Sequence, residues 1–205
     1  DMRSAEEVIA YLKKLRLILK YLGVSDCKMQ EGSLRADINL SVRETGAKEF
    51  GTRTEMKNMS SFKAIARAVA GERKRQIDVL SSGGRIVQET RRWDESENKS
   101  ISMRTKEDAH DYRYFPEPDL VPLEITEEWI KEIKAREPEL RDAKMARYER
   151  EFGIPAYDAA IITGAKKMAD IFEETVALCG KPKEVSNWLM VETMRLLKEA
   201  EMDAE

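Results

Sequence analysis

The sequence is 205 residues long, with 41% hydrophobic residues, 37% charged residues and a formal net charge of −3. These values are typical of one or two globular domains with a highly charged surface, and they exclude a global positive field for nucleic acid. Apolar runs are all shorter than the roughly 20 residues of a membrane-spanning helix. Cys27 and Cys179 are not spaced as a metal site or disulfide scaffold, so we expect a reducing, cytoplasmic setting and no membrane partner.

The first predicted element is a helix. Ser4 and Glu7 form a capping box, in which a hydroxyl and a carboxylate satisfy the free N–H groups of a helix start. Apolar residues then recur at helical spacing from Val8 to Leu22. Gly23 is expected to end the helix.

The stretch from Glu31 to Phe62 predicts two short strands joined by a tight turn. Apolar and polar residues alternate in both halves, so each strand has one apolar and one polar face. Gly46 supplies the turn because glycine tolerates a positive φ. If the strands pair, one sheet face carries a polar set: Arg35, Asp37, Asn39, Arg53, Glu55 and Lys57.

This polar set has two interpretations. Two carboxylates, an amide and several cations on one face suit Mg²⁺ together with a phosphate group. The alternative is a solvated sheet face with cross-strand ion pairs, which composition alone favours because antiparallel sheets often show one polar face to water.

A second helix and a second hairpin follow. Ser60 or Ser61 can cap the helix, and Gly83-Gly84 ends it. Residues 85–93 and 99–105 are expected to pair as strands. The segment 108–119 is predicted to be an ordered loop. Its part from Asp111 to Asp119 is expected to cover or buttress the sheet, because it is dense in aromatic residues: Tyr112, Tyr114 and Phe115.

From Thr126 onward the pattern is helical throughout. Helices are expected at about 126–136, 139–152, 155–163, 166–179 and 182–199. The predicted fold class is therefore α+β: an antiparallel sheet with flanking helices, followed by an all-helical domain. The predicted domains are residues 1–124 and 125–205.

The helical part holds more acidic than basic residues, so any RNA contact there must be local. Two basic clusters could make phosphate contacts, or could be plain solvated faces. They consist of Lys144, Arg147 and Arg150, and of Lys166 and Lys167.

Several long motifs occur in one order at natural spacing. These are EGSLRADINLSV, FGTRTEMKNMSSF, QETRRWDE and DYRYFPEPDLVPL, followed by GIPAYDAAIIT and VSNWLM. Together they closely resemble the B subunit family of the tRNA-dependent aspartyl/glutamyl amidotransferases. The resemblance covers essentially the whole chain, and it favours a functional polar face over a solvated one.

The resemblance implies an ATP-hydrolysing carbon–nitrogen ligase. Members of that family use ATP and Mg²⁺ to phosphorylate the side-chain carboxylate of Glu or Asp misacylated onto tRNA(Gln) or tRNA(Asn). An amidase A subunit supplies ammonia through a channel, and a small C subunit clasps the two larger ones. By position, the resemblance implies catalytic roles for Asp37, Glu55 and Lys57, Mg²⁺ ligation by Asp37 and Glu55, and ATP binding by Arg35 and Asn39.

The chain also departs from the family pattern. The family has a Gly-Leu-Glu-Val-His segment that contributes to the metal site, and this chain has no counterpart of it. Ala36 replaces a Cys that is frequent in the family. We therefore expect residues 1–124 to be the C-terminal part of a catalytic cradle domain, in a fragment that is inactive alone and ends before the family's tail domain. The alternatives are a non-catalytic tRNA-binding module and an unrelated nucleotide-binding α+β protein.

Overall fold

The computed structural model describes residues 1–105 and 114–204. By contact, the chain divides into two compact units. The first unit comprises Asp1–Lys13 and Cys27–Leu123, and the second comprises Lys14–Asp26 and Glu124–Glu205.

Helix α1 (Ala5–Tyr21) thus gives its first half to one unit and its second half to the other. Its start is the predicted one, since the Glu7 backbone N–H donates to Ser4 Oγ at 3.2 Å. The functional domains 1–124 and 125–205 stay a prediction, because compactness alone does not assign a role.

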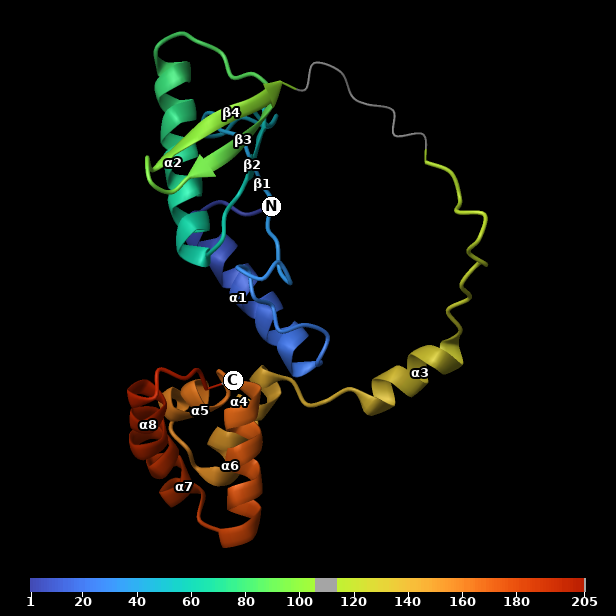
Figure 1. Cartoon of the computed structure of the whole chain (residues 1–205), viewed down its shortest axis with the longest axis vertical. Coiled ribbons are helices and arrows are strands. Elements are labelled where there is room, and N and C mark those ends of the chain that lie inside the picture. Colours follow the sequence, from blue (N-terminus) through green and yellow to red (C-terminus); the bar gives the residue numbers. More distant parts are fainter. Residues whose placement is uncertain (106–113, 205) are drawn as a thin grey trace. The chain divides into compact units, whose positions relative to one another are not determined.

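The first unit contains a four-stranded sheet in the order β1-β2-β3-β4 (Figure 1). Its strands are β1 (Ile38–Leu40), β2 (Thr54–Lys57), β3 (Glu89–Asp94) and β4 (Lys99–Thr105). The α+β class is confirmed, but the sheet is mixed. The outer pairs β1–β2 and β3–β4 are antiparallel, whereas β2 and β3 are parallel.

Helix α2 (Phe62–Ser81) explains the parallel pair. It connects β2 to β3 as a crossover and returns the chain to the end of the sheet from which β2 started, which parallel neighbours require. The expectation of a wholly antiparallel sheet is therefore wrong at this pairing. The Ala64 backbone N–H donates to Ser61 Oγ at 3.0 Å, so Ser61 is the cap.

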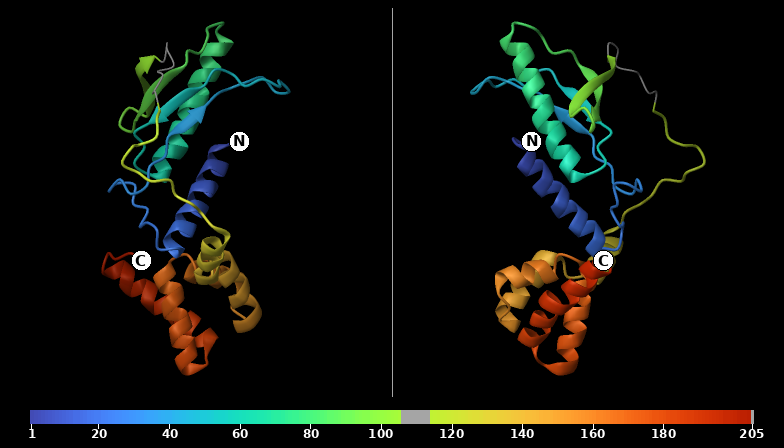
Figure 2. Two further views of the ribbon diagram at one scale, coloured as in Figure 1. Left: turned by 90° about the vertical axis from the view of Figure 1, so that its right-hand side faces the viewer. Right: turned by 60° about the vertical axis from the view of Figure 1, so that its left-hand side comes forward.

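The core of the first unit lies between the sheet and the helices α2 and α1 (Figures 1 and 2). Met56 and Trp93 point into it from β2 and β3, and both are buried. Gly71 of α2 faces the Trp93 ring so closely that a Cβ at position 71 would lie 2.9 Å from two ring carbons. A glycine in mid-helix is costly, and here it makes room for the indole.

The predicted first hairpin forms, but its strands are shorter than expected. β2 begins at Thr54, and residues 41–53 form an irregular connection. Gly46 has a φ of 90° and lies in a turn that the Ala47 N–H closes on Glu44 O at 3.1 Å. The turn chemistry was therefore correctly predicted, and the strand ends were not.

The second unit is helical (Figure 2). Tyr148, Phe152 and Phe172 pack their rings together in its core, with centroids 4.7–5.7 Å apart. The predicted helix at 182–199 is a continuous helical run with a π-type turn, η1, in its middle. The elements are α3 (Glu127–Arg136), α4 (Arg141–Phe152), α5 (Ala156–Ile162), α6 (Lys166–Cys179), α7 (Pro182–Trp188), η1 (Leu189–Thr193) and α8 (Met194–Glu199).

The predicted packing of the aromatic loop is wrong where it can be checked. Tyr114 is 92% exposed and Phe115 is 79% exposed, while Tyr112 lies outside the described residues. The inner side of the sheet is already filled by α2 and the start of α1, which leaves these rings outside the core. None of the described helices combines the length and the hydropathy needed to cross a membrane.

Candidate active site on the outer face of the sheet

Strand register decides which residues share the face of the sheet that points away from α2, here called the outer face. Ile38 lies opposite Met56, and Asn39 lies opposite Glu55. Because Met56 is fully buried against the core, its neighbours Glu55 and Lys57 point to the outer face. Of the predicted polar set, Asn39, Glu55 and Lys57 therefore share one face, whereas their chemical roles stay predictions.

Lys57 is the centre of this face. Its Nζ lies 3.0 Å from Asp37 Oδ2 and 3.4 Å from Glu55 Oε1, so two carboxylates converge on one cation. The side chains of Lys57 and Asp37 are about one-third exposed. The hydrogen bond to Asp37 is the main cause that raises the pKa of Lys57, so the ammonium stays charged at neutral pH.

Thr90 of β3 holds the other oxygen of the Glu55 carboxylate. Its hydroxyl donates to Glu55 Oε2 at 2.9 Å, and the residue is buried. The Glu55 carboxylate is therefore anchored to its own strand through Lys57 and to the next strand through Thr90. Two anchors restrict its rotamers more than a single surface ion pair would.

The two residues predicted to bind ATP lie nearby on the chain. Asn39 is exposed on β1, directly opposite Glu55. Arg35 is exposed and precedes β1, so its position on the outer face depends on the irregular segment before the strand. Asn39 is thus placed beside the carboxylates by regular pairing, and Arg35 is not.

Thr90 and Arg92 were missed by sequence reasoning. The parallel register sets Glu55 beside Thr90 and Lys57 beside Arg92, which brings a further hydroxyl and a further cation to the outer face. Alternation along β3 separates these two residues from Glu89, Arg91 and Trp93 on the other face. That alternation was visible in the sequence, but the strand partner and its direction were not.

A shallow hollow adjoins the ends of β2 and β3. Its volume is about 290 Å³, and Arg92 is one of its charged residues. It is therefore continuous with the outer face through that arginine. Its lining residues are Asn58, Ser60, Arg92, Trp93, Asp94, Glu95 and Ser96.

The carboxylate pair fits part of a magnesium site. Mg²⁺ is commonly held by one or two carboxylates, with water and substrate phosphates completing its octahedron. Asp37 and Glu55 supply two such carboxylates, and they already converge on a positive group. In the part of the chain that the structure describes, no cluster of three or more His, Cys, Asp or Glu residues could hold a metal by itself.

The first basic cluster of the helical unit is paired with carboxylates of the same unit. Lys144 is buried, and its Nζ lies 2.6 and 2.7 Å from the two carboxylate oxygens of Glu173. Arg147 donates to Glu139 at 2.7 Å and also binds Glu173. The Lys144 charge is therefore neutralised inside the unit. Arg147 is also paired, but its side chain is 24% exposed, so RNA contact by Arg147 stays a prediction.

The remaining basic residues lie nearer the surface. Arg150 pairs with Glu151 at 2.7 Å, and Lys166 pairs with Asp170 at 2.6 Å one helical turn away. Lys167 is exposed. Exposed ion pairs of this kind contribute little free energy, so these residues can still exchange their carboxylate partners for other anions.

Comparisons with known proteins assign the chain to a family. The family model described as the GatB/GatE catalytic domain matches residues 1–131. The chain belongs to this family. The matched residues of the GatB/GatE catalytic domain include all four strands and every residue of the outer face named above.

Curated relatives extend over the whole chain. The chain is 77% identical over 205 residues to the B subunit of the aspartyl/glutamyl-tRNA(Asn/Gln) amidotransferase of Lachnoclostridium phytofermentans, and the match covers 100% of this chain and 43% of that protein. The corresponding B subunits of Caldicellulosiruptor saccharolyticus and Chlorobium phaeobacteroides are each 57% identical, over 100% and 97% of this chain and 43% and 42% of theirs. The chain thus spans less than half the length of these relatives.

Proposed function

We propose that the whole protein containing this chain phosphorylates the side-chain carboxylate of Glu or Asp misacylated onto tRNA, at the expense of ATP, and amidates it with ammonia. One observation carries the proposal. In a member of this family, Asp37, Glu55 and Lys57 converge on a single partly exposed sheet face. An acceptor carboxylate and a nucleotide both bring negative charge, so the site must supply positive charge beside fixed ligands.

Each residue of the face has a role in this proposal. Asp37 and Glu55 would hold Mg²⁺, which when bound neutralises charge on the transferring phosphoryl group. Lys57 and Arg35 would face phosphate oxygens, and Asn39 would donate its amide N–H groups to the nucleotide. Arg92 lies beside Lys57 in the sheet and adds a cation toward the neighbouring hollow.

The proposed reaction has two steps, phosphorylation of the carboxylate and then amidation. An oxygen of the substrate carboxylate attacks the γ-phosphorus of ATP, the bond to the β-phosphate oxygen breaks, and ADP leaves. Ammonia then attacks the carbonyl carbon of the acyl phosphate, phosphate leaves with its oxygen, and the ammonium nitrogen loses a proton. A free carboxylate is a poor electrophile, so the first step is what makes the second possible.

The partners follow from the same chemistry. Misacylated tRNA(Gln) or tRNA(Asn) would carry the substrate, an amidase A subunit would release ammonia from glutamine, and a small C subunit would hold the two large subunits together. Residues 1–124 would supply part of the catalytic domain and residues 125–205 a helical domain. With fewer than half of the relatives' residues present, the chain alone would not amidate tRNA.

The test replaces Glu55 by glutamine in the full-length subunit assembled with its partners. Glu55→Gln keeps the shape and removes the charge, so amidation and tRNA-dependent ATP hydrolysis should fall at least about 10²–10³-fold, as when one transition-state stabiliser is removed. The partner's glutamine hydrolysis should persist. The matched control is Glu97→Gln, an exposed carboxylate on the β3–β4 turn, which should retain full activity. Wild-type amidation by Glu55→Gln would exclude Glu55 from the site.

A further inference from the structure

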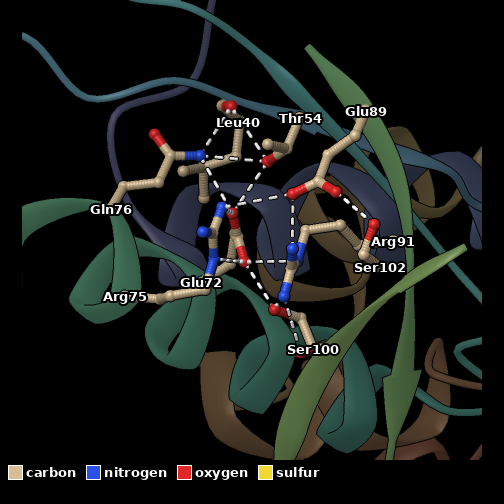
Figure 3. A network of polar contacts seen from close by, with 9 residues as sticks. All are labelled: Leu40, Thr54, Glu72, Arg75, Gln76, Glu89, Arg91, Ser100 and Ser102. Carbon is tan, nitrogen blue, oxygen red and sulfur yellow. Dashed lines mark hydrogen bonds and ion pairs between the residues drawn. The ribbon is translucent and has the colours of Figure 1, made fainter. Parts of the chain in front are cut away.

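A second group of charged side chains lies on the opposite, inner face of the sheet, against α2 (Figure 3). Its centre is Glu72 of α2, whose side chain is fully buried. The Glu72 carboxylate accepts hydrogen bonds from Thr54 at 2.9 Å, Ser100 at 2.6 Å and Arg75 at 2.7 Å. A buried carboxylate with this many donors is satisfied and charged.

Hydrogen bonds and ion pairs of this group reach residues of every strand in the sheet, and the residues are drawn in Figure 3. Thr54 belongs to β2 and Ser100 to β4. Gln76 of α2 donates to the backbone oxygen of Leu40 in β1 at 3.2 Å and to the Thr54 hydroxyl at 3.0 Å. Arg91 of β3 lies 3.5 Å from Glu72 and donates to the Ser100 backbone oxygen at 2.8 Å.

Burial separates this group from chemistry on a substrate. The Glu72 side chain has no exposed surface, so it cannot touch ATP, metal or the aminoacyl end of tRNA. Burying a carboxylate and a guanidinium is costly in free energy unless both are well partnered. Here the many hydrogen bonds to Glu72 offset that cost, so the group is a well-partnered ionic cluster inside the core.

The geometry links the inner group to the outer face through single peptide steps. Thr54, which binds Glu72, is the residue before Glu55. Arg91, which pairs with Glu72, is the residue after Thr90. The hydrogen bond from Thr90 to Glu55 crosses the parallel β2–β3 pair, so it forms only in the register that the inner group holds.

We propose that Glu72 is a positioning residue: by holding Thr54 of β2 and Arg91 of β3, it sets the register that places the Glu55 carboxylate between Lys57 and Thr90. This role rests on the proposed function, because it matters only if Glu55 is part of the active site. Losing a hydrogen-bond partner of a metal ligand typically lowers metal affinity 10- to 100-fold, and Thr90 is such a partner of Glu55.

The test uses Glu72→Gln in the full-length subunit assembled with its partners. The first readout is binding of Mn²⁺, used in place of Mg²⁺ and followed by the loss of the free-ion paramagnetic resonance signal, without turnover. The second is a double-mutant cycle for amidation with Glu55→Gln. We expect about 10- to 100-fold weaker Mn²⁺ binding by Glu72→Gln, and no further loss when it is added to Glu55→Gln.

A merely structural role predicts a different result. It would lower the fraction of folded enzyme while leaving the Mn²⁺ dissociation constant of the folded molecules unchanged, and its effect would add to that of Glu55→Gln. The matched control is Glu173→Gln, which removes a hub carboxylate from the helical unit. It should lower stability and leave Mn²⁺ binding at the wild-type value.

Two outcomes overturn the ideas separately. If Glu55→Gln leaves Mn²⁺ binding and amidation intact, the proposed site itself is wrong. If Glu55→Gln abolishes both but folded Glu72→Gln binds Mn²⁺ normally, the positioning role of Glu72 is wrong.

A second variant is available if Glu72→Gln does not fold. Thr54→Val removes only the hydroxyl that joins β2 to Glu72. That variant should weaken Mn²⁺ binding about threefold to tenfold, and an unchanged constant would likewise reject the proposal.

Discussion

The two faces of one sheet use the same residue types in opposite ways. On the outer face, Lys57 and Asp37 are about one-third exposed and share a small number of contacts. On the inner face, Glu72 is fully buried and Arg91 nearly so, and donors surround the carboxylate. Groups that stay partly solvated can exchange their partners for a ligand, whereas groups that are buried and saturated hold strands in place.

The helical unit follows the pattern of the inner face. Glu173 binds Lys144, Arg147 and Tyr148 within the unit. Two local basic clusters there were candidates for RNA contacts, but Lys144 is buried and Arg147 is held by two carboxylates. The number of charged residues in a sequence therefore does not tell how many of them can contact a ligand, because some are buried.

The largest difference between the faces should appear in unfolding. Glu72→Ala removes a buried carboxylate that Arg75 and Arg91 share and leaves Glu89 as their remaining acidic partner, so it should destabilise the first unit by about 3–5 kcal/mol, whereas Asp37→Ala should cost less than about 1 kcal/mol. Trp129→Phe and Trp188→Phe leave buried Trp93 as the only tryptophan of the chain. Urea denaturation followed by its fluorescence measures both changes, and equal losses would contradict the comparison.

The second-largest expected effect is a loss of folding stability at low pH that comes from the inner face. Burial opposes ionisation of Glu72, but hydrogen bonds from Arg75, Ser100 and Gln76 outweigh it and lower its pKa to about 2. A depressed pKa stabilises the fold above the unfolded value of roughly 4.3, and that stability is lost as pH falls through 2. The loss should reach about 3 kcal/mol across this window.

The same Trp93 fluorescence can follow this titration by urea melts at successive pH values. Glu72→Gln is the matched control, because a side chain that cannot ionise removes this component of the pH dependence. A wild-type and a Glu72→Gln protein with the same slope between roughly pH 4.3 and 2 would show that Glu72 is not charged in the fold.

The smallest expected effect distinguishes two arginines of the helical unit. Arg147→Ala removes hydrogen bonds to Glu139 and Glu173 and should cost about 1–2 kcal/mol, discounted for its partial exposure, as measured by thermal melting. Arg150→Ala should stay within about 0.5 kcal/mol because its pair is exposed. Neither change alone should move the tRNA dissociation constant of the folded, assembled protein more than about twofold, and a clear fall in affinity with Arg147→Ala would restore it to an RNA surface.

Local features of this protein could be predicted from its amino-acid pattern alone. Alternation placed Asp37, Glu55 and Lys57 on one face, and capping residues set the starts of α1 and α2. These features depend on neighbours a few residues apart, through the period of a strand or the free N–H groups of a helix end. The polar face of the candidate site was therefore predictable before any coordinates.

The strand that lies next to β2 in the sheet, and the identity of the buried charges, depend on long-range packing. The parallel pairing that brings Thr90 to Glu55 joins residues 35 positions apart. Burial of Glu72, and of Lys144 beside Glu173, likewise depends on distant segments packing together. Local pattern carries no record of a long-range partner, since the same alternating strand can pair on either edge and in either direction.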